Sequence, residues 1–413
     1  MYDYIIIGGG ISGLYMNSLL VCTNSLPVCT NSKKYKTLLL EKNNYLGGRA
    51  LETKFHNEYI KHGAGIASLH NTQLLSLLKK LKIKYQILDA DTNLLFTTKF
   101  DMKKATKKII KIYKIEKKKK NEDIYAINVK QFIEKYISKK FFNEYDKQTE
   151  YKDYMKTNMD YYINHYPIKD NIPEPYILIA LKWKDLIDKL YKIIKYHNQD
   201  IKLNYNVEYI TYDKVNECYM IDNKYCTKKI IFATTLNGIQ GILNNSTLLN
   251  INYNKYLGSV SFVKIYTYHK NGHNLKNNID IDDYNITDNK LSKIIIINKN
   301  MLVLTYSDNG NAHYWYNLYN TDKEKLIDKL KELCKKSTGQ DIEIDDIKFI
   351  YWNEGVHYFK PRNYNNFDKY INSLAHPCDN IYVIGEMLSY KQGWVEGAIE
   401  SANRIYKIIK KDC

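Results

Sequence analysis

The sequence predicts an α/β protein, and three features of the chain support this fold class. The apolar run Tyr2–Ile7 has the β-branched residues of a buried parallel strand. It leads directly into the glycine-rich turn Gly8–Gly13, and an apolar helical stretch follows. A second short apolar strand, Ile381–Ile384, lies near the other end of the chain and is also followed by glycine. Together these features predict a Rossmann-like nucleotide-binding domain.

The composition is that of a globular protein with ample core, because 44% of its 413 residues are hydrophobic and 26% are charged. No apolar run approaches the ~18–20 residues of a membrane span, and we expect no secretory signal because a nucleotide-binding strand begins almost at Met1. The seven cysteines form no CxxC pair, so we expect reduced thiols and no metal site. A soluble protein of the cytoplasm is therefore expected.

The net charge of +17 comes almost entirely from lysine, since only three of the 62 basic residues are arginine. This bias indicates an AT-rich genome more than a nucleic-acid surface, where bidentate arginine contacts are common. The segment Lys99–Lys120 holds eleven lysines against two acids. We expect it to be a solvated surface, with a polyanion-binding arm as the alternative, and we expect no specific nucleic-acid partner.

The first motif has the spacing GxGxxG between a strand and a helix, which is the context that a dinucleotide requires. Gly8 permits a tight turn, Gly10 lets a pyrophosphate approach the backbone, and Gly13 lets the helix pack closely on the strand. Ser12 lies in the same turn. The phosphates are expected at the helix N-terminus, where free N–H groups and the helix dipole favour anions.

The motif also requires an acid about 20 residues further on, to bind a ribose hydroxyl. Glu41, which ends the run Thr37–Leu40, is the candidate, although it follows Gly13 by 28 residues. A tandem repeat explains the excess, because Val21–Ser25 recurs as Val28–Ser32 with a period of seven residues. Without one copy the spacing is 21, as expected, and Cys22 and Cys29 are then copies of one residue rather than ligands.

The triplet Gly47–Arg49 follows Glu41 closely, and a plain NAD-binding domain has no need of it. Together with the first motif it resembles the flavin-dependent amine oxidase superfamily, which includes monoamine and polyamine oxidases. The resemblance implies non-covalently bound FAD. The residues that it places near FAD in these segments are Gly48, Arg49, Gly63 and Ala64. The chain departs from the family at Asn43, where an arginine is common, and at His62, where an acid is common.

The C-terminal segment carries the most specific part of the resemblance. The strand Ile381–Ile384 runs into Gly385 and Glu386, and Gly393–Ala398 opens the last helix. The resemblance implies that Gly385 and Glu386 contact FAD and that the helix N-terminus, with Trp394 and Val395, faces the flavin. Backbone N–H groups there would stabilise the negative charge of the reduced flavin.

In the middle of the chain the pattern predicts helices from Thr72 to about Pro173. A helix over Asp185–Ile194, a strand over Ile201–Ile210 and a short strand over Lys229–Thr234 follow. Their order resembles the return of the chain to the FAD domain, which implies that Val207 lies near the adenine.

Two further strands carry the candidate catalytic residues. Leu257–Tyr268 contains Lys264, which the resemblance places beside a water at flavin N5; the alternative is an ordinary lysine in an exposed strand. The second strand carries Tyr358, which matches one aromatic residue of a cage around the substrate, and Trp394 matches the other. His357 falls where monoamine oxidases have the cysteine that attaches FAD, and we expect a hydrogen-bonded pocket histidine rather than a covalent link.

The resemblance implies a GR2-type, Rossmann-like FAD-binding domain with an inserted α+β substrate domain. The expected limits are 1–68, 178–252 and 356–413 for the FAD-binding domain, and 69–177 and 253–355 for the substrate domain, which includes the lysine-rich helical insert.

The implied reaction transfers a hydride from an amine α-carbon to flavin N5, giving an imine, and O2 then reoxidises the flavin to give hydrogen peroxide. Two alternatives remain. One is a flavin-dependent desaturase or protoporphyrinogen-type oxidase with an apolar substrate, and the other is a non-catalytic polyanion-binding flavoprotein.

Overall fold

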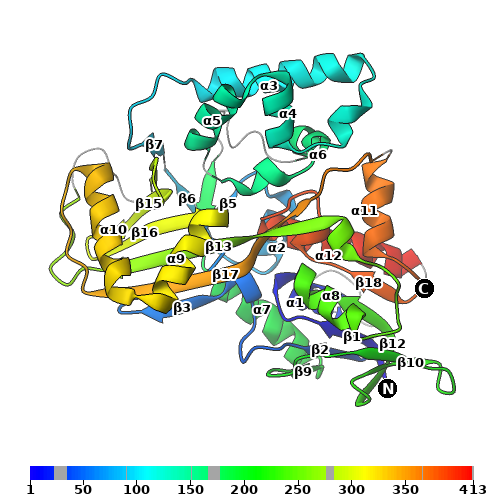
Figure 1. Cartoon of the computed structure of the whole chain (residues 1–413). Helices are drawn as coiled ribbons and strands as arrows, with labels where there is room; N and C mark the ends of the chain where they lie inside the picture. Colours follow the sequence, from blue (N-terminus) through cyan, green and yellow to red (C-terminus); the bar gives the residue numbers. More distant parts are fainter. Residues whose placement is uncertain are drawn as a thin grey trace.

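The computed structural model of the chain is shown in Figure 1, and it describes residues 1–22, 35–89, 91–149, 151–165, 177–275, 283–364 and 366–411. The tandem repeat lies outside the described residues apart from Val21 and Cys22. Within the described ranges, no helix is long and apolar enough to cross a membrane.

The first sheet gathers segments that are far apart in the sequence. Its strands follow the order β10-β11-β12-β1-β2-β9, and β18 also pairs with β12. These strands are β1 (Tyr2–Ile7), β2 (Thr37–Leu40), β9 (Asp200–Lys202), β10 (Ile210–Asp213), β11 (Cys218–Ile221), β12 (Tyr225–Phe232) and β18 (Ile381–Val383). The central pairs are parallel, whereas β10, β11 and β12 form an antiparallel edge. Strands from both ends of the chain therefore flank β12.

Helices cover both faces of this parallel core, as the buried apolar strands require. Ile5 and Ile6 of β1 and Leu38 of β2 have no exposed surface. Helix α1 lies between α7 and α12 and contacts both. The helices around this sheet are α1 (Ile11–Val21), α2 (Thr72–Lys80), α7 (Trp183–Tyr196), α8 (Leu236–Asn244), α11 (Phe367–Ala375) and α12 (Val395–Lys411).

The second sheet has the order β17-β13-β16-β15-β14-β7. Its strands are β7 (Thr92–Leu94), β13 (Leu257–Tyr268), β14 (Tyr284–Ile286), β15 (Lys293–Asn298), β16 (Met301–Asp308) and β17 (Asp346–Phe359). On one face, Val263 and Leu304 pack with Trp315 of α9 (Asn309–Thr321) and Leu330 of α10 (Lys323–Thr338). The other face packs on the hairpin β3 (Glu52–Phe55) and β4 (Glu58–Lys61), which follows the Gly47–Arg49 loop. Two smaller sheets are formed by this hairpin and by β5 (Ala67–Ser68), β8 (Leu178–Ala180) and β6 (Gln86–Leu88).

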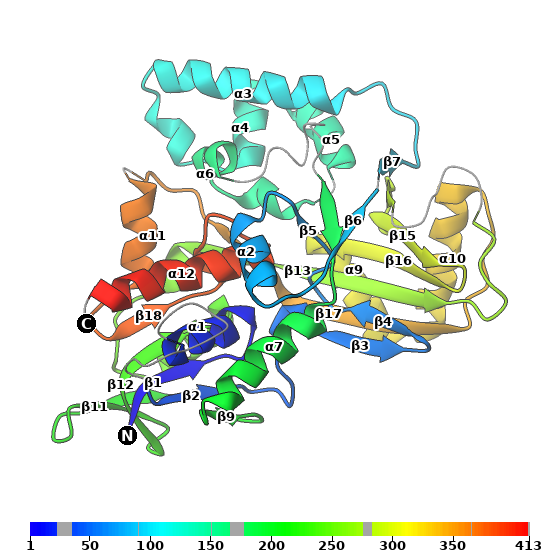
Figure 2. The same ribbon diagram turned by 180° about the vertical axis from the view of Figure 1, so that it is seen from behind.

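A separate helical cluster lies beyond the second sheet, at the top of Figures 1 and 2. It consists of α3 (Met102–Lys118), α4 (Val129–Tyr136), α5 (Lys139–Gln148) and α6 (Met159–Asn164). Its own core includes Ile109, Phe132 and Tyr145.

Two secondary-structure predictions were wrong in part. The region from Thr72 onward is not helical throughout, because β6 and β7 pair with β8 and β14 before the first helix of the cluster. The strand predicted over Ile201–Ile210 is divided into β9 and β10. Asn204 adopts φ +54°, a left-handed conformation that ends an extended strand, and Val207 lies in the connecting segment.

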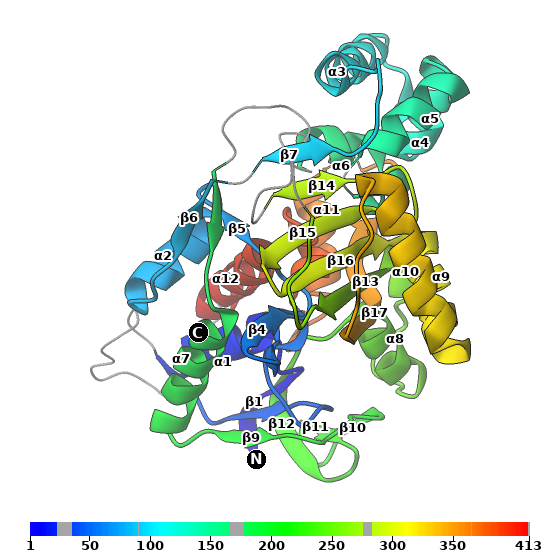
Figure 3. The same cartoon turned by 90° about the vertical axis from the view of Figure 1, so that its left-hand side faces the viewer.

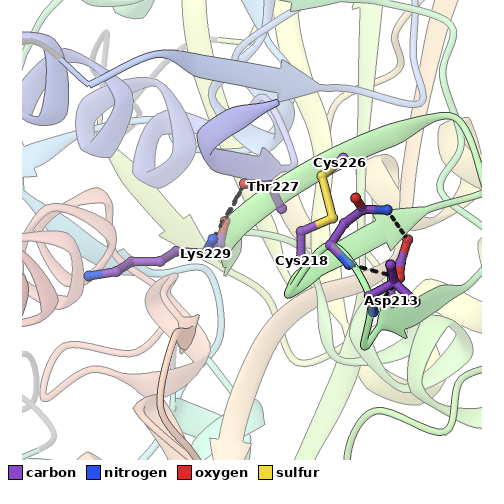
Figure 4. The surroundings of a disulfide bond; sticks show 7 residues. Asp213, Cys218, Cys226, Thr227 and Lys229 are labelled. Carbon is purple, nitrogen blue, oxygen red and sulfur yellow. Dashed lines mark hydrogen bonds between the residues drawn. A yellow bond between two sulfur atoms is a disulfide. The ribbon is translucent and has the colours of Figure 1, made fainter.

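The expectation that all cysteines are reduced was also wrong, because Cys218 and Cys226 form a disulfide (Figure 4). They lie on β11 and β12, which are antiparallel neighbours, and their Cα atoms are 6.1 Å apart. Cys334 is a buried free thiol and Cys378 is an exposed one, whereas Cys22 Sγ lies 3.4 Å from His197 Nε2. The cysteines therefore give no support to a reducing compartment, and the cytoplasmic location stays a prediction.

Candidate dinucleotide site and active site

The three motif glycines of the first turn differ in the space around them. Gly8 adopts φ +113°, and a Cβ atom there would lie 2.5 Å from the Ala233 carbonyl oxygen. A Cβ atom at Gly13 would lie 2.0 Å from the Gly8 oxygen, so helix and strand approach too closely for a side chain. At Gly10, in contrast, no atom lies within 4 Å of the Cβ position. The turn therefore needs glycine at positions 8 and 13 for packing and is open at position 10.

The N-terminus of α1 opens at the same place. Gly10 is its N-cap residue, so no side chain caps it, and the first turn contains no acid. Ser12 is buried in this turn, and its Oγ atom lies 3.9 Å from the Cβ position of Gly385. Free N–H groups at a helix N-terminus bind phosphate groups, so this end of α1 can bind a pyrophosphate.

Glu41 directly follows β2 and is buried beside the turn. Its Oε2 atom accepts a hydrogen bond from the Gly9 N–H at 2.7 Å. Its Oε1 atom accepts from the backbone N–H of Asn43 at 2.8 Å and from its side-chain amide at 2.7 Å. A carboxylate has about four acceptor positions, so one remains for a ribose hydroxyl. Asn43 therefore positions the carboxylate of Glu41.

The Gly47–Arg49 segment lies against the first turn. The Gly47 N–H donates to the Gly9 oxygen at 2.8 Å, and a Cβ atom at Gly48 would lie 3.4 Å from Gly10 Cα. Both Gly47 and Gly48 adopt positive φ angles, of 101° and 54°. The structure thus brings the two glycine loops together at the open position 10.

The next loop packs on Arg49 in turn. A Cβ atom at Gly63 would lie 2.2 Å from the Arg49 oxygen, and the Ala64 N–H donates to that oxygen at 2.9 Å. Gly385, with φ +129°, donates its N–H to Ser401 Oγ of α12 at 2.9 Å. Val207 is buried in the main core, and Val395, the first residue of α12, is half-buried.

Glu386 is the centre of a buried charge network. Its Oε1 atom accepts from Arg49 Nη1 at 2.6 Å and from His357 Nδ1, and its Oε2 atom accepts from the Gly393 N–H at 2.9 Å. Burial alone would raise the pKa of Glu386, but the positive charges of Arg49 and His357 outweigh it and lower that pKa to about 2. Glu386 is therefore a carboxylate at neutral pH.

His357 is a hydrogen-bond partner of Glu386, and the sequence analysis predicted a pocket histidine without naming this partner. Burial opposes its protonation, but Glu386 and Glu354 raise its pKa. The neutral ring accepts from the Leu236 N–H at Nε2 (3.2 Å), and the protonated ring faces Glu354 Oε1, which lies 3.6 Å from the same nitrogen. The ring is only 1% exposed. Both of its nitrogens have polar partners inside the protein.

Lys264 is buried in β13, with 3% of its surface exposed, so the alternative of an exposed strand lysine was wrong. Its Nζ atom donates to the Gly63 oxygen at 2.8 Å and lies 3.4 Å from the Lys61 oxygen. Burial, reinforced by Lys61 and Lys293, lowers its pKa to about 7. A lysine with this pKa exchanges a proton near neutral pH.

The two predicted aromatic residues lie on neighbouring segments. The Tyr358 ring covers Gly258 of β13, where a Cβ atom would lie 2.3 Å from the ring carbon Cζ. Trp394 directly precedes α12 and is half-buried. The Cβ position of Gly393 lies 3.2 Å from Val356 Cγ1, so the ends of β17 and the start of α12 meet.

Besides Lys264, the second sheet contains another buried lysine that the sequence analysis missed. Lys293 of β15 is 1% exposed, and its Nζ atom lies 3.2 Å from the centre of the Tyr151 ring and 4.3 Å from that of Tyr306. The Nζ atom of Lys264 lies 4.9 Å from the same Tyr306 ring. Because lysine is common throughout the chain, no pattern marked Lys293 as buried. Among the described residues, no group of three or more His, Cys, Asp or Glu side chains could hold a metal ion.

Comparisons with known proteins identify the type of nucleotide-binding domain. Residues 6–81 match the family of NAD(P)-binding Rossmann-like domains. The uncharacterised protein R188 of Acanthamoeba polyphaga mimivirus is 25% identical over 119 residues, and the match covers 25% of this chain and only 23% of that protein.

Three solved structures are similar over almost the whole chain. A double mutant of putrescine oxidase with redesigned cofactor binding has a TM-score of 0.74 at 14% identity, covering 99% of both chains. Cyclohexylamine oxidase from Brevibacterium oxydans has a TM-score of 0.73 at 13% identity, covering 100% of this chain and 99% of that one. Wild-type putrescine oxidase bound to putrescine has a TM-score of 0.71 at 13% identity, covering 99% of both. The predicted α/β fold with its Rossmann-like domain is therefore confirmed.

Proposed function

We propose that this chain is an FAD-dependent amine oxidase. The observation that carries the proposal is the meeting of four separate segments at one place. The Gly8–Gly13 turn contacts the Gly47–Arg49 loop, Arg49 contacts the loop at Gly63 and Ala64, and Arg49 also binds Glu386. The similarity in fold to putrescine oxidase and cyclohexylamine oxidase supports it.

The residues present fit a dinucleotide, because the space at Gly10 that a Cβ atom would fill lies beside the uncapped end of α1. In this proposal Gly10, Ser12 and Arg49 hold the pyrophosphate and Glu41 holds the adenosine ribose. Val207 lies near the adenine. The flavin half of FAD is lined by Gly48, Gly63, Ala64, Gly385, Glu386 and Val395. Bound FAD would supply the acceptor for a hydride from the amine α-carbon and would pass the electrons to O2, giving an imine and hydrogen peroxide.

The protein side chains have distinct tasks in this proposal. Tyr358 and Trp394 exclude water from the amine, and the loss of hydration favours its uncharged form. Lys264, with its Nζ atom on the Gly63 oxygen, holds a proton beside the loop that faces the flavin. Lys264 then delivers that proton when O2 is reduced.

His357 supports non-covalent binding of FAD. Its Nδ1 atom is occupied by Glu386, and its Nε2 atom faces Leu236 and Glu354. Attachment at either nitrogen would break this buried arrangement. The division into an FAD-binding domain at 1–68, 178–252 and 356–413 and a substrate domain at 69–177 and 253–355 is part of the same proposal.

An anaerobic titration tests the function directly. The purified protein, reconstituted with FAD, is mixed with a panel of monoamines, diamines and amino acids, and its absorbance spectrum is recorded. Loss of the oxidised-flavin bands with an amine, and hydrogen peroxide on readmission of O2, are expected. A protein that binds no FAD would contradict the proposal, and a flavoprotein reduced only by apolar compounds would contradict its amine specificity.

A further inference from the structure

The helix α3 forms the outer edge of the helical cluster in all three views (Figures 1, 2 and 3). Its inner face is fixed to the protein, because Ala105, Ile109 and Tyr113 are buried in the core of the cluster. The outer face of α3 is therefore presented rigidly, and its apolar side is not free to enter a bilayer.

The outer face carries a stripe of lysines, which we call the lysine stripe: Lys103, Lys107, Lys111, Lys114 and Lys118. Their spacing of four, four, three and four residues places them on one side of a helix, over about 22 Å. All five are exposed. Within the described part of the chain, none of them has an ion pair, whereas Lys104 and Lys117 lie near Asp101 and Asp160.

The stripe exceeds the lysine bias of the chain. Eight of the 17 residues of α3 are lysine, whereas lysine makes up 59 of 413 residues in the whole chain. Like charges three or four residues apart destabilise a helix, by about 0.2–0.5 kcal/mol for each pair. An AT-rich genome explains frequent lysine, but it does not explain why these lysines lie on one face.

We propose that the lysine stripe docks the protein on an anionic lipid surface. A flat row of cationic point charges matches a layer of negatively charged headgroups. Ile115, on the margin of the same face, is 42% exposed and can enter the interface. Nucleic acid is disfavoured, because the outer face has no arginine for bidentate contacts and the one aromatic residue of α3, Tyr113, lies on the buried inner face. The proposal does not depend on the oxidase activity.

The test uses the full-length protein and sedimentation with phosphatidylcholine vesicles, with and without phosphatidylserine. In the stripe variant all five lysines are replaced by glutamine, which has a similar helix propensity. The control variant carries five other exposed lysines changed to glutamine, on α7 and α10: Lys189, Lys192, Lys195, Lys325 and Lys336. Both variants lose the same charge, so they separate a local surface from the general attraction of a protein with a net charge of +17.

We expect the wild type and the control to bind only the phosphatidylserine vesicles, and to be released by high salt. Each lysine near an anionic surface raises binding about fivefold, so the stripe variant should bind at least roughly a hundredfold more weakly. If that variant does not fold by circular dichroism, the double variant Lys107→Gln, Lys111→Gln replaces it, with an expected loss of about 25-fold.

Three results would overturn the proposal. One is equal loss of binding in the stripe and control variants, which would show a net-charge effect. Another is equal binding of the wild type to uncharged vesicles. The third is tighter, stripe-dependent binding to duplex DNA than to phosphatidylserine vesicles, which would identify a nucleic acid as the partner.

Discussion

His357 donates a hydrogen bond from Nδ1 to Glu386, and this contact joins β17 of the second sheet to the segment after β18 of the first sheet. The same carboxylate also accepts from the Gly393 N–H. The sequence neighbours of His357 and Gly393 are Tyr358 and Trp394, whose rings are proposed to enclose the amine. The buried carboxylate of Glu386 therefore sets the relative position of the two segments that carry these aromatic rings.

The first prediction concerns the substitution Glu386→Gln. It removes the charge that Arg49 and His357 face, and the Gln amide cannot accept all three hydrogen bonds. We expect the variant to lose about 2–4 kcal/mol of unfolding free energy, less than for a fully buried pair because Arg49 is 26% exposed. We also expect weaker FAD retention. Denaturant unfolding and flavin absorbance measure the two effects.

The loss must also depend on pH. The pKa of Glu386 is lowered from 4.5 to about 2, so its ionised form stabilises the fold fully above pH 4.5 and loses this effect as pH falls toward 2. The difference in Tm between wild type and Glu386→Gln should therefore shrink over this range. Glu343→Gln is the matched control, because Glu343 is 89% exposed. A constant difference down to pH 2 would contradict the assigned network.

The second prediction compares Gly10→Ala with Gly13→Ala. At Gly13 the added methyl group meets the Gly8 oxygen, so we expect a loss of stability on the order of 1–3 kcal/mol or more. At Gly10 it meets no protein atom and φ is −72°, so stability without cofactor should change by less than about 0.5 kcal/mol.

The same methyl group at Gly10 enters the space assigned to the pyrophosphate. We expect FAD affinity to fall by roughly tenfold or more in Gly10→Ala, as about 1.4 kcal/mol of lost contact would give. Fluorescence titration of the apoprotein with FAD measures this. Unchanged affinity in a well-folded Gly10→Ala protein would place the dinucleotide elsewhere.

The third prediction concerns the disulfide. Alkylation of the unfolded, unreduced protein should leave Cys218 and Cys226 unmodified, while Cys334 and Cys378 react. Closing a short loop restricts the unfolded chain, so Cys226→Ser should cost about 2–3 kcal/mol of stability. Peptide mass spectrometry checks the pairing. Alkylation of both Cys218 and Cys226 in protein isolated without reductant would show that they are reduced thiols and would contradict the disulfide.

Some elements could be predicted from the sequence to the residue. β1, β2 and β13 have the predicted bounds, because each is a stretch of mostly β-forming residues that its neighbours largely bury. The division at Asn204 was not predictable in the same way, since it depends on a left-handed residue whose N–H bonds to the Asn43 oxygen of another segment. Local pattern gives no information about such a partner.

The candidate site shows the same limit. The positive φ of Gly8 and the close approach of Gly13 to the Gly8 oxygen are local features, and the motif alone predicted them. The partners of Glu386 come from positions 49, 357 and 393, which only the tertiary fold brings together. Cys218 and Cys226 likewise pair because β11 and β12 are neighbours in the sheet, and a search for CxxC motifs does not find them.

The last prediction concerns Lys264→Met, which keeps the length of the side chain but cannot hold a proton. If Lys264 supplies a proton when O2 is reduced, reoxidation of the flavin should slow on the order of 10²-fold, and reduction by amine should change much less. Anaerobic reduction and reoxidation, each followed by stopped-flow absorbance, separate the two steps. Lys348→Met is the control, because Lys348 is exposed on the neighbouring strand β17.

The pH dependence distinguishes this role from a merely structural one. Burial lowers the pKa of Lys264 from 10.5 to about 7, so its Nζ atom is charged below pH 7 and neutral above it. Reoxidation of the wild type should therefore be faster below pH 7 and fall as pH rises through about 7, and the step should vanish in Lys264→Met. Equal slowing of both half-reactions, or a step that persists in the variant, would refute the assignment, because the proton would then come from another group.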